Sequence, residues 1–237
     1  MQPTPESPAP QHVPGGATGA SPLPDGAARP GASAASGGGS EPGAAKAALR
    51  SALRARRRAV EPGQREAERR GWAASAGQLA AWALAAAPPG RPACLAAYLP
   101  AVSEPDPTAA MAQWHAAGLS VLVPLSLPGR RLAWVRWTPE LRVSRGAHAP
   151  VPEPVGGEPA DPAGIDLVVV PALAVGTDGT RLGQGGGFYD GFLAGRVTPT
   201  VACVRSDEVL DIVPAEAWDA RLDAAWTPEG LRRLSAV

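Results

Sequence analysis

The stretch IDLVVVPALAVGTDGTRLGQGGGFYDGFL, residues 165–193, decides the fold of this chain. An apolar run at 165–173 has the length of a buried strand, and it is followed by a turn, Arg181 and the glycine-rich loop 183–187. A helix is expected to begin at Phe188. Glycines let neighbouring backbone N–H groups converge, and a helix N-terminus adds partial positive charge. The stretch therefore predicts a strand–loop–helix unit that binds an anion such as phosphate.

Two charged residues bracket this loop. Arg181 offers a planar cation suited to phosphate oxygens, and Asp190 offers a hard oxygen ligand for the Mg²⁺ that accompanies a nucleotide. The loop is neither a P-loop, because Phe188 and Tyr189 stand where Lys and Ser or Thr are needed, nor a Rossmann fingerprint. The structural alternative is a tight strand-to-helix turn in which Asp190 only favours the helix dipole.

Apolar runs and helical periodicity extend this unit into one α/β domain with a largely parallel open sheet, flanking helices and one antiparallel hairpin. The hairpin turn is the segment PGRR at 128–131, and residues 142–163, rich in Pro and Gly, are expected to form a long loop. Further strands are expected at 93–99, 119–125, 132–137, 200–204 and 221–226, and helices at about 64–86, from Thr108 to a cap at Gly118, and at 188–194.

The N-terminal part divides at about residue 43. Residues 1–43 are a Pro/Gly/Ala/Ser tract that predicts a disordered tail, and residues 44–237 form the domain. The domain opens with a cationic helix on which Lys46 and Arg50 are four positions apart and share a face. Lys46 is the single lysine among 22 basic residues, which indicates a need for a compact point charge, although a solvated lysine kept by chance is the alternative.

Composition excludes several classes of protein. The formal net charge is zero, which argues against bulk binding of nucleic acid or an anionic membrane. No apolar stretch is long enough to span a bilayer, and a signal peptide pattern is absent, so a cytoplasmic location is expected. Cys94 and Cys203 lie in apolar runs, which predicts free thiols, and the three histidines form no zinc motif.

The segment RLGQGGGFYDGFL at 181–193, preceded by VPALAV at 170–175, resembles the signature of the 5-formyltetrahydrofolate cyclo-ligase family. The similarity extends over about residues 44–234. Further pieces agree in order and spacing: the Lys46/Leu49/Arg50 helix, YLPAVSEPDPT at 98–108, EP at 153–154, VPAEAWD at 213–219 and WTPEG at 226–230.

The resemblance implies roles for individual residues. Lys46 and Arg50 contact ATP, Lys46 and Arg181 stabilise charge in the transferring phosphoryl group, and Asp190 with Asp219 holds Mg²⁺. The loop residues that contact ATP are Arg181, Leu182, Gly183, Gln184, Gly185, Gly186, Gly187, Phe188 and Tyr189. Leu99 and Glu104 contact the folate. From the residues alone, Glu104 is better explained as a solvated loop acid, and Asp219 is an ordinary loop residue.

The implied reaction is ATP-dependent closure of 5-formyltetrahydrofolate to 5,10-methenyltetrahydrofolate with release of ADP and phosphate. The expected substrate is a reduced folate with or without a polyglutamate tail, and the protein is expected to be a monomer. The chain departs from the usual family pattern at Gln184, Gly191 and Trp218. The alternative is therefore a catalytically weak paralogue that binds folate or nucleotide, and a third hypothesis is a phosphate-binding domain with another substrate.

Overall fold

The computed structural model describes residues 41–216 and 219–235. The first helix, α1 (Glu41–Ala59), begins slightly before the predicted end of the tail. The rest of the predicted tail and Trp218 lie outside the described residues. None of the helices in the described ranges is long and apolar enough to span a bilayer.

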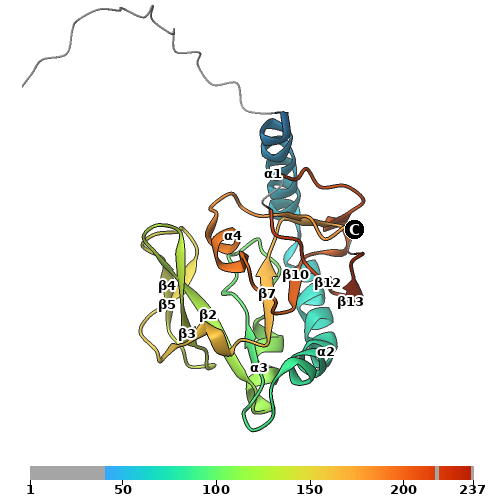
Figure 1. Cartoon of the computed structure of the whole chain (residues 1–237). Coiled ribbons are helices and arrows are strands. Elements are labelled where there is room, and N and C mark those ends of the chain that lie inside the picture. Colours follow the sequence, from blue (N-terminus) through green and yellow to red (C-terminus); the bar gives the residue numbers. More distant parts are fainter. Residues whose placement is uncertain (1–40, 217–218, 236–237) are drawn as a thin grey trace, which may run out of the picture. The chain divides into compact units, whose positions relative to one another are not determined.

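The predicted fold class is confirmed: an eight-stranded sheet, parallel at its centre, carries helices on its faces (Figure 1). The strand order is β13-β12-β10-β7-β1-β2-β3-β6. The pairs from β12 to β2 are parallel, and β13, β3 and β6 add antiparallel edges. The bounds are β1 (Cys94–Ala96), β2 (Ser120–Leu127), β3 (Arg131–Arg136), β6 (Pro159–Ala160), β7 (Leu167–Pro171), β10 (Thr200–Cys203), β12 (Ala224–Thr227) and β13 (Gly230–Arg233).

Strand β7 shows why the sheet has two covered faces. Leu167 and Val169 belong to the core cluster of one face, and Val168 and Val170 to the cluster of the other, because successive side chains of a strand point in opposite directions. All four are fully buried. A continuous apolar run is therefore the sequence pattern of a central strand covered on both sides.

Three further helices cover the sheet. Helix α2 (Pro62–Ala86) and helix α3 (Thr108–Ala116) lie side by side and fill one core cluster, whereas α4 (Phe188–Leu193) packs beside β3 on the other (Figure 1). Met111 and Trp114 point inward, and Gly118, the predicted cap, follows the end of α3 at φ 82°. Both cysteines are buried and free, as expected.

The structure corrects one expectation and adds detail to another. Residues 142–163 are not one long loop: they contain β4 (Val143–Arg145), β5 (Pro152–Pro154), β6 and a short 3₁₀ helix, η1 (Pro162–Gly164). Such short strands, rich in Pro, carry no period-two signal that a sequence pattern could reveal. The hairpin at 128–131 joins β2 to β3 as predicted, and the pairs β4–β5 and β12–β13 are also antiparallel.

A small second sheet positions the glycine-rich loop. It has the order β11-β8-β9, formed by β8 (Ala174–Gly176), β9 (Arg181–Leu182) and β11 (Val209–Leu210), which follows the 3₁₀ helix η2 (Ser206–Glu208). Helix α1 packs on this sheet through Leu53, which meets Leu173 and Leu182 in a third apolar cluster. The glycine-rich loop leaves β9 beside α1, near the edge where the parallel strands β1 and β7 end.

Candidate active site

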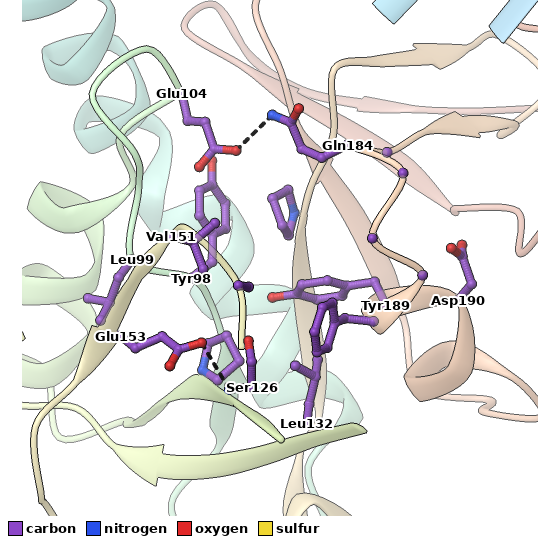
Figure 2. Close-up of a pocket in the computed structure, with 18 of the residues that line it drawn as sticks. Tyr98, Leu99, Glu104, Ser126, Leu132, Val151, Glu153, Gln184, Tyr189 and Asp190 are labelled. Carbon is purple, nitrogen blue, oxygen red and sulfur yellow. Dashed lines mark hydrogen bonds between the residues drawn. The ribbon is translucent and has the colours of Figure 1, made fainter. Parts of the chain in front are cut away.

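A cavity lies where the carboxyl ends of β1 and β7 meet the glycine-rich loop, the usual place for a ligand in an open α/β sheet (Figure 2). One wall comes from the segment after β1, and the opposite wall from residues 183–190. Strands β2 and β5 close a third side. The lining side chains outside the loop are Tyr98, Leu99, Glu104, Pro124, Ser126, Leu132, Val151, Glu153 and Arg181, with Ala149, Pro152 and Pro171.

The glycine-rich loop has two backbone conformations that only glycine adopts without strain. Gly185 and Gly187 have φ angles of 95° and 74°, in the left-handed region. A Cβ on Gly187 would also lie 3.2 Å from Cδ of Arg130, which reaches the loop from the β2–β3 turn. The loop is held from the other side by Arg50 of α1, whose Nε donates to the Gly183 carbonyl oxygen at 3.0 Å.

A polar bridge connects α1, the loop and the segment after β1. Arg54 donates through Nε to the Gln184 Oε1 atom at 3.0 Å and through Nη2 to the Gln184 carbonyl oxygen at 2.7 Å. Gln184 in turn donates from Nε2 to Oε1 of Glu104 at 3.1 Å (Figure 2). The side chain at position 184 thus links the loop assigned to ATP with the acid assigned to folate.

Arg181 and Asp190, the two charged ends of the loop, form an ion pair with each other. Arg181 is only 6% exposed, and its guanidinium lies about 6.0 Å from the centre of the Tyr189 ring. Strand pairing of Val175 with Arg181 fixes the backbone from which this side chain projects. Arg181 is therefore a buried cation at the cavity wall, and its guanidinium is already paired with the Asp190 carboxylate.

Lys46, predicted to contact ATP, is bound to two carboxylates of the C-terminal segment. Its Nζ lies 2.6 Å from Oε2 of Glu216 and 2.6 Å from Oδ2 of Asp219. Burial disfavours the charged amine, but hydrogen bonds and charge attraction from Asp219 and Glu216 outweigh it and raise the pKa of Lys46. The side chain is 5% exposed, so these contacts also fasten α1 to the end of the domain.

The two predicted Mg²⁺ ligands do not present free carboxylates. Asp190 is paired with Arg181, and Asp219 is paired with Lys46 and accepts a hydrogen bond from the Glu216 amide at 2.8 Å. Among the residues that the structure describes, no group of three Asp, Glu, His or Cys side chains could hold a metal ion. The contacts engage one oxygen of each carboxylate, Oδ1 of Asp190 and Oδ2 of Asp219, so a metal would bind beside a cation of the chain or displace it.

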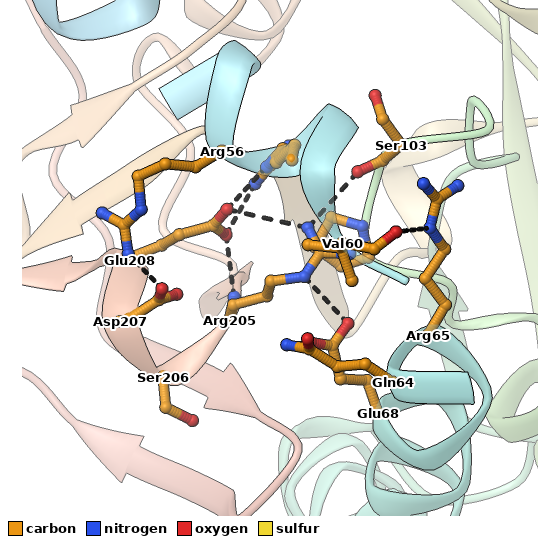
Figure 3. A network of polar contacts seen from close by, with 12 residues as sticks. Arg56, Val60, Gln64, Arg65, Glu68, Ser103, Arg205, Ser206, Asp207 and Glu208 are labelled. Atoms are coloured by element: carbon orange, nitrogen blue, oxygen red, sulfur yellow. Dashed lines mark hydrogen bonds and ion pairs between the residues drawn. The ribbon is translucent and has the colours of Figure 1, made fainter. Parts of the chain in front are cut away.

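A network of polar contacts, buried at Arg57, Arg205 and Glu208, joins the helices to the segments near the site (Figure 3). Arg57 of α1 pairs with Glu208 through two contacts of 2.7 Å and donates to the Ala172 carbonyl oxygen at 2.5 Å. Arg205 donates to Glu68 of α2 at 2.8 Å and to the Ser103 carbonyl oxygen at 3.3 Å. The network ties both helices to the segment that carries Glu104.

Comparison with known proteins places the chain in a family. The sequence model of the 5-formyltetrahydrofolate cyclo-ligase family matches residues 42–228. The 5-formyltetrahydrofolate cyclo-ligase of Mycolicibacterium smegmatis is 36% identical over 196 residues, which cover 78% of this chain and 94% of that protein. This chain belongs to the 5-formyltetrahydrofolate cyclo-ligase family. The expected family resemblance is thereby confirmed.

Solved structures of cyclo-ligase relatives agree with the fold. The 5,10-methenyltetrahydrofolate synthetase of Aquifex aeolicus superposes with a TM-score of 0.63 at 26% identity, over 81% of this chain and 94% of that one. The 5,10-methenyltetrahydrofolate synthetase of Mycoplasma pneumoniae has a TM-score of 0.59 at 20% identity, over 78% of this chain and 99% of that one, and its likeness concerns the fold.

In this member of the cyclo-ligase family, the predicted site residues fall into three groups according to where their side chains lie. Leu99, Glu104 and most of the loop line one cavity, and Arg50 braces that loop. Lys46 and Asp219 pair with each other instead. The Leu182 side chain is buried in the cluster beneath α1.

Other cavity residues were not found by sequence reasoning. They are Tyr98, Ser126, Leu132 and Glu153, together with Arg54 at the bridge. Three of them carried a signal: Arg54 continues the four-residue spacing of Lys46 and Arg50, and Tyr98 and Glu153 lie in the pieces at 98–108 and 153–154 that resemble the family.

Proposed function

We propose that this chain uses ATP to convert 5-formyltetrahydrofolate into 5,10-methenyltetrahydrofolate. Membership of the cyclo-ligase family supports the reaction. The observation that carries the proposal to this chain is one cavity with two unlike kinds of lining: apolar side chains such as Leu99 and Leu132, and the glycine-rich loop with Arg181. Such a cavity suits a ring system whose faces pack against apolar side chains while a phosphate group lies beside it.

The chemistry explains why one enzyme needs both ligands. An N5-formyl amide is a poor electrophile because its nitrogen donates electrons into the carbonyl group. In the proposed reaction the formyl oxygen attacks the γ-phosphorus of ATP and ADP leaves, which converts that oxygen into a leaving group. N10 then adds to the activated carbon and loses its proton. Departure of phosphate completes the methenyl bridge, so ADP and phosphate form in equal amounts.

The protein's part in this proposal is positioning and charge stabilisation. Arg181, Lys46 and the loop amides of residues 183–187 stabilise the phosphoryl oxygens, and Arg50 fixes the loop through the Gly183 carbonyl oxygen. Since Lys46 is held by Glu216 and Asp219 in the free chain, its use by ATP requires an exchange of partners. Leu99 and Glu104 contact the folate.

We propose Mg²⁺ as the companion of ATP, with Asp190 and Asp219 as the residues that would hold it. Magnesium in nucleotide sites is usually bound by one or two carboxylates together with phosphate oxygens. When bound, it would supply charge neutralisation at the phosphates. A monomeric enzyme located in the cytoplasm remains a prediction from the sequence, as does the acceptance of polyglutamylated folates.

The deciding experiment is a spectrophotometric assay of the full chain with 5-formyltetrahydrofolate and Mg·ATP. The methenyl product has its own absorption band, and ADP should appear in a 1:1 ratio to it. Reactions without folate measure any uncoupled ATP hydrolysis. Binding of both ligands without product would favour the binding-protein alternative, and ATP hydrolysis independent of folate would favour a phosphate-binding domain with another substrate.

A further inference from the structure

The hydroxyl group of Tyr189 is a polar group at the cavity that lacks a hydrogen-bond partner. Its oxygen is buried and has no hydrogen-bond partner among the residues that the structure describes. Figure 2 shows Tyr189 directing this hydroxyl toward the side of the cavity where Glu153 and Ser126 lie. Leaving a buried hydroxyl unpaired costs about 1–3 kcal/mol, so a phenylalanine at this position would serve the fold better. The hydroxyl therefore indicates a ligand.

Glu153 is a buried carboxylate in the same cavity. It is 4% exposed, and its Oε1 atom accepts one hydrogen bond, from the Ser126 amide at 3.1 Å. No cation in the described part of the chain pairs with it. Gly146 leaves the space that this carboxylate occupies, because a Cβ there would lie 2.4 Å from Cδ of Glu153. A buried charge with so few partners is costly unless a ligand supplies hydrogen-bond donors.

Glu104, the acid that the family resemblance assigns to folate, is in a different situation. Its Oε2 atom accepts from the Ala101 amide at 3.0 Å, and its Oε1 atom accepts from Gln184 at 3.1 Å. Both oxygens are already engaged, and the residue is less buried than Glu153. Of the two cavity acids, Glu153 has the larger unmet need for donors.

We propose that Glu153 and Tyr189 together bind the hydrogen-bonding edge of the pterin ring. This inference rests on the proposed function and adds a residue pair to it. The edge presents two donors, the 2-amino group and N3–H, followed by one acceptor, the 4-oxo oxygen. Glu153 accepts from the two donors and Tyr189 donates to the oxo group. Tyr189 thus serves the folate rather than ATP.

The surroundings of the pair fit this role. Leu99, Leu132 and Pro124 line the same cavity with apolar atoms, which suits the faces of a ring. Burial raises the pKa of the Tyr189 hydroxyl, with nearby Arg181 opposing the change and Glu104 adding to it, so the group remains a donor at neutral pH. Ser126 holds the carboxylate in place from β2.

The test is calorimetric binding of 5-formyltetrahydrofolate to the full-length chain without ATP. Tyr189→Phe removes only the hydroxyl, and Glu153→Gln keeps an oxygen that can accept from the Ser126 amide. Each variant should bind the folate about 10-fold or more weakly, the scale for losing a hydrogen bond in a buried site. p-Aminobenzoylglutamate, which lacks the pterin, should bind all three proteins equally.

Thermal melts provide the control for folding. Tyr189→Phe should melt at or above the wild-type temperature because it removes an unsatisfied group. Tyr98→Phe is the matched control from the same cavity, and it should melt lower, because the Tyr98 hydroxyl donates to the Pro105 carbonyl oxygen at 2.7 Å. If Glu153→Gln fails to fold, Tyr189→Phe alone still decides the question.

The outcomes separate this inference from the proposed function. Wild-type binding that Tyr189→Phe leaves unchanged would overturn the pterin assignment and leave the proposed reaction intact. An equal loss of p-aminobenzoylglutamate binding would also overturn it, because the pair would then act on the whole cavity. If the wild-type chain bound no folate at all, the proposed function itself would fail.

Discussion

The ion pairs of Lys46 lead us to predict that this residue stabilises the fold. A lysine that only binds a ligand from a helix surface would not be needed for stability. Lys46→Met removes the charge but keeps most of the apolar stem. It leaves Glu216 and Asp219 without the ammonium group that lies 2.6 Å from each. We expect the variant to be less stable as well as less active.

The magnitude follows from burial. Removing one partner of a fully buried ion pair costs about 3–5 kcal/mol, whereas an exposed pair contributes about 0.2–1 kcal/mol. The Lys46 side chain is 6% exposed, but those of Glu216 and Asp219 are 28% and 16% exposed, so water can solvate the acids left behind. We therefore expect a loss of about 2 kcal/mol, which corresponds to a fall in Tm of about 4–8 °C for a domain of this size.

Calorimetry and urea unfolding measure this loss. Arg58→Met is the matched control, because Arg58 is exposed on the same helix and has no ion pair among the described residues. The pKa of Lys46 is raised in the folded chain, so its contribution is complete below the unfolded value of about 10.5 and is lost only above the folded value. The difference between Lys46→Met and the wild type should therefore be constant between about pH 7 and 9.

Two results would refute this reasoning. One is a Tm of Lys46→Met that lies within about 1 °C of the Arg58→Met control, since the ion pairs would then contribute no stability. The other concerns the triple variant Lys46→Met, Glu216→Gln, Asp219→Asn. It should recover part of the lost stability because no uncompensated carboxylate remains, and a further fall instead would show that the acids stabilise the fold without the lysine.

Three further predictions concern the site and the core. Arg181→Ala should lower kcat by about 10²–10³, the scale for losing one preorganised charge stabiliser, in the steady-state absorbance assay. Asp190→Asn should nearly abolish turnover and Asp219→Asn should raise the Mg²⁺ concentration needed for half-maximal rate; an unchanged Mg²⁺ titration would remove Asp219 from the metal site. Burial raises the pKa of Cys94 to about 11 and that of Cys203 to about 12, so neither thiol should react with a disulfide reagent at pH 8 until urea unfolds the chain; fast labelling of the native protein would contradict this.

The sequence by itself determined the fold class and the location of the glycine-rich loop. The run at 167–173 is apolar at every position, and only a strand covered on both faces needs that pattern, which β7 satisfies. Glycines at 183 and 185–187 between a strand and a helix are a local signal, because glycine is the residue that readily adopts the positive φ angles of a tight loop. The four-residue spacing of Lys46 and Arg50 likewise fixed a shared helix face.

Only the tertiary structure decided which side chains meet. Lys46 and Glu216 are 170 positions apart, and Gln184 and Glu104 are 80 apart, so strand order and the packing of α1 bring them together. Periodicity encodes the face on which a residue lies but not the residue that it faces. Glu153 sits on a three-residue strand with proline on both sides, where the family resemblance marked the piece EP but gave it no role, and its place in the cavity that Tyr189 also lines arises from the packing of β5 against β2.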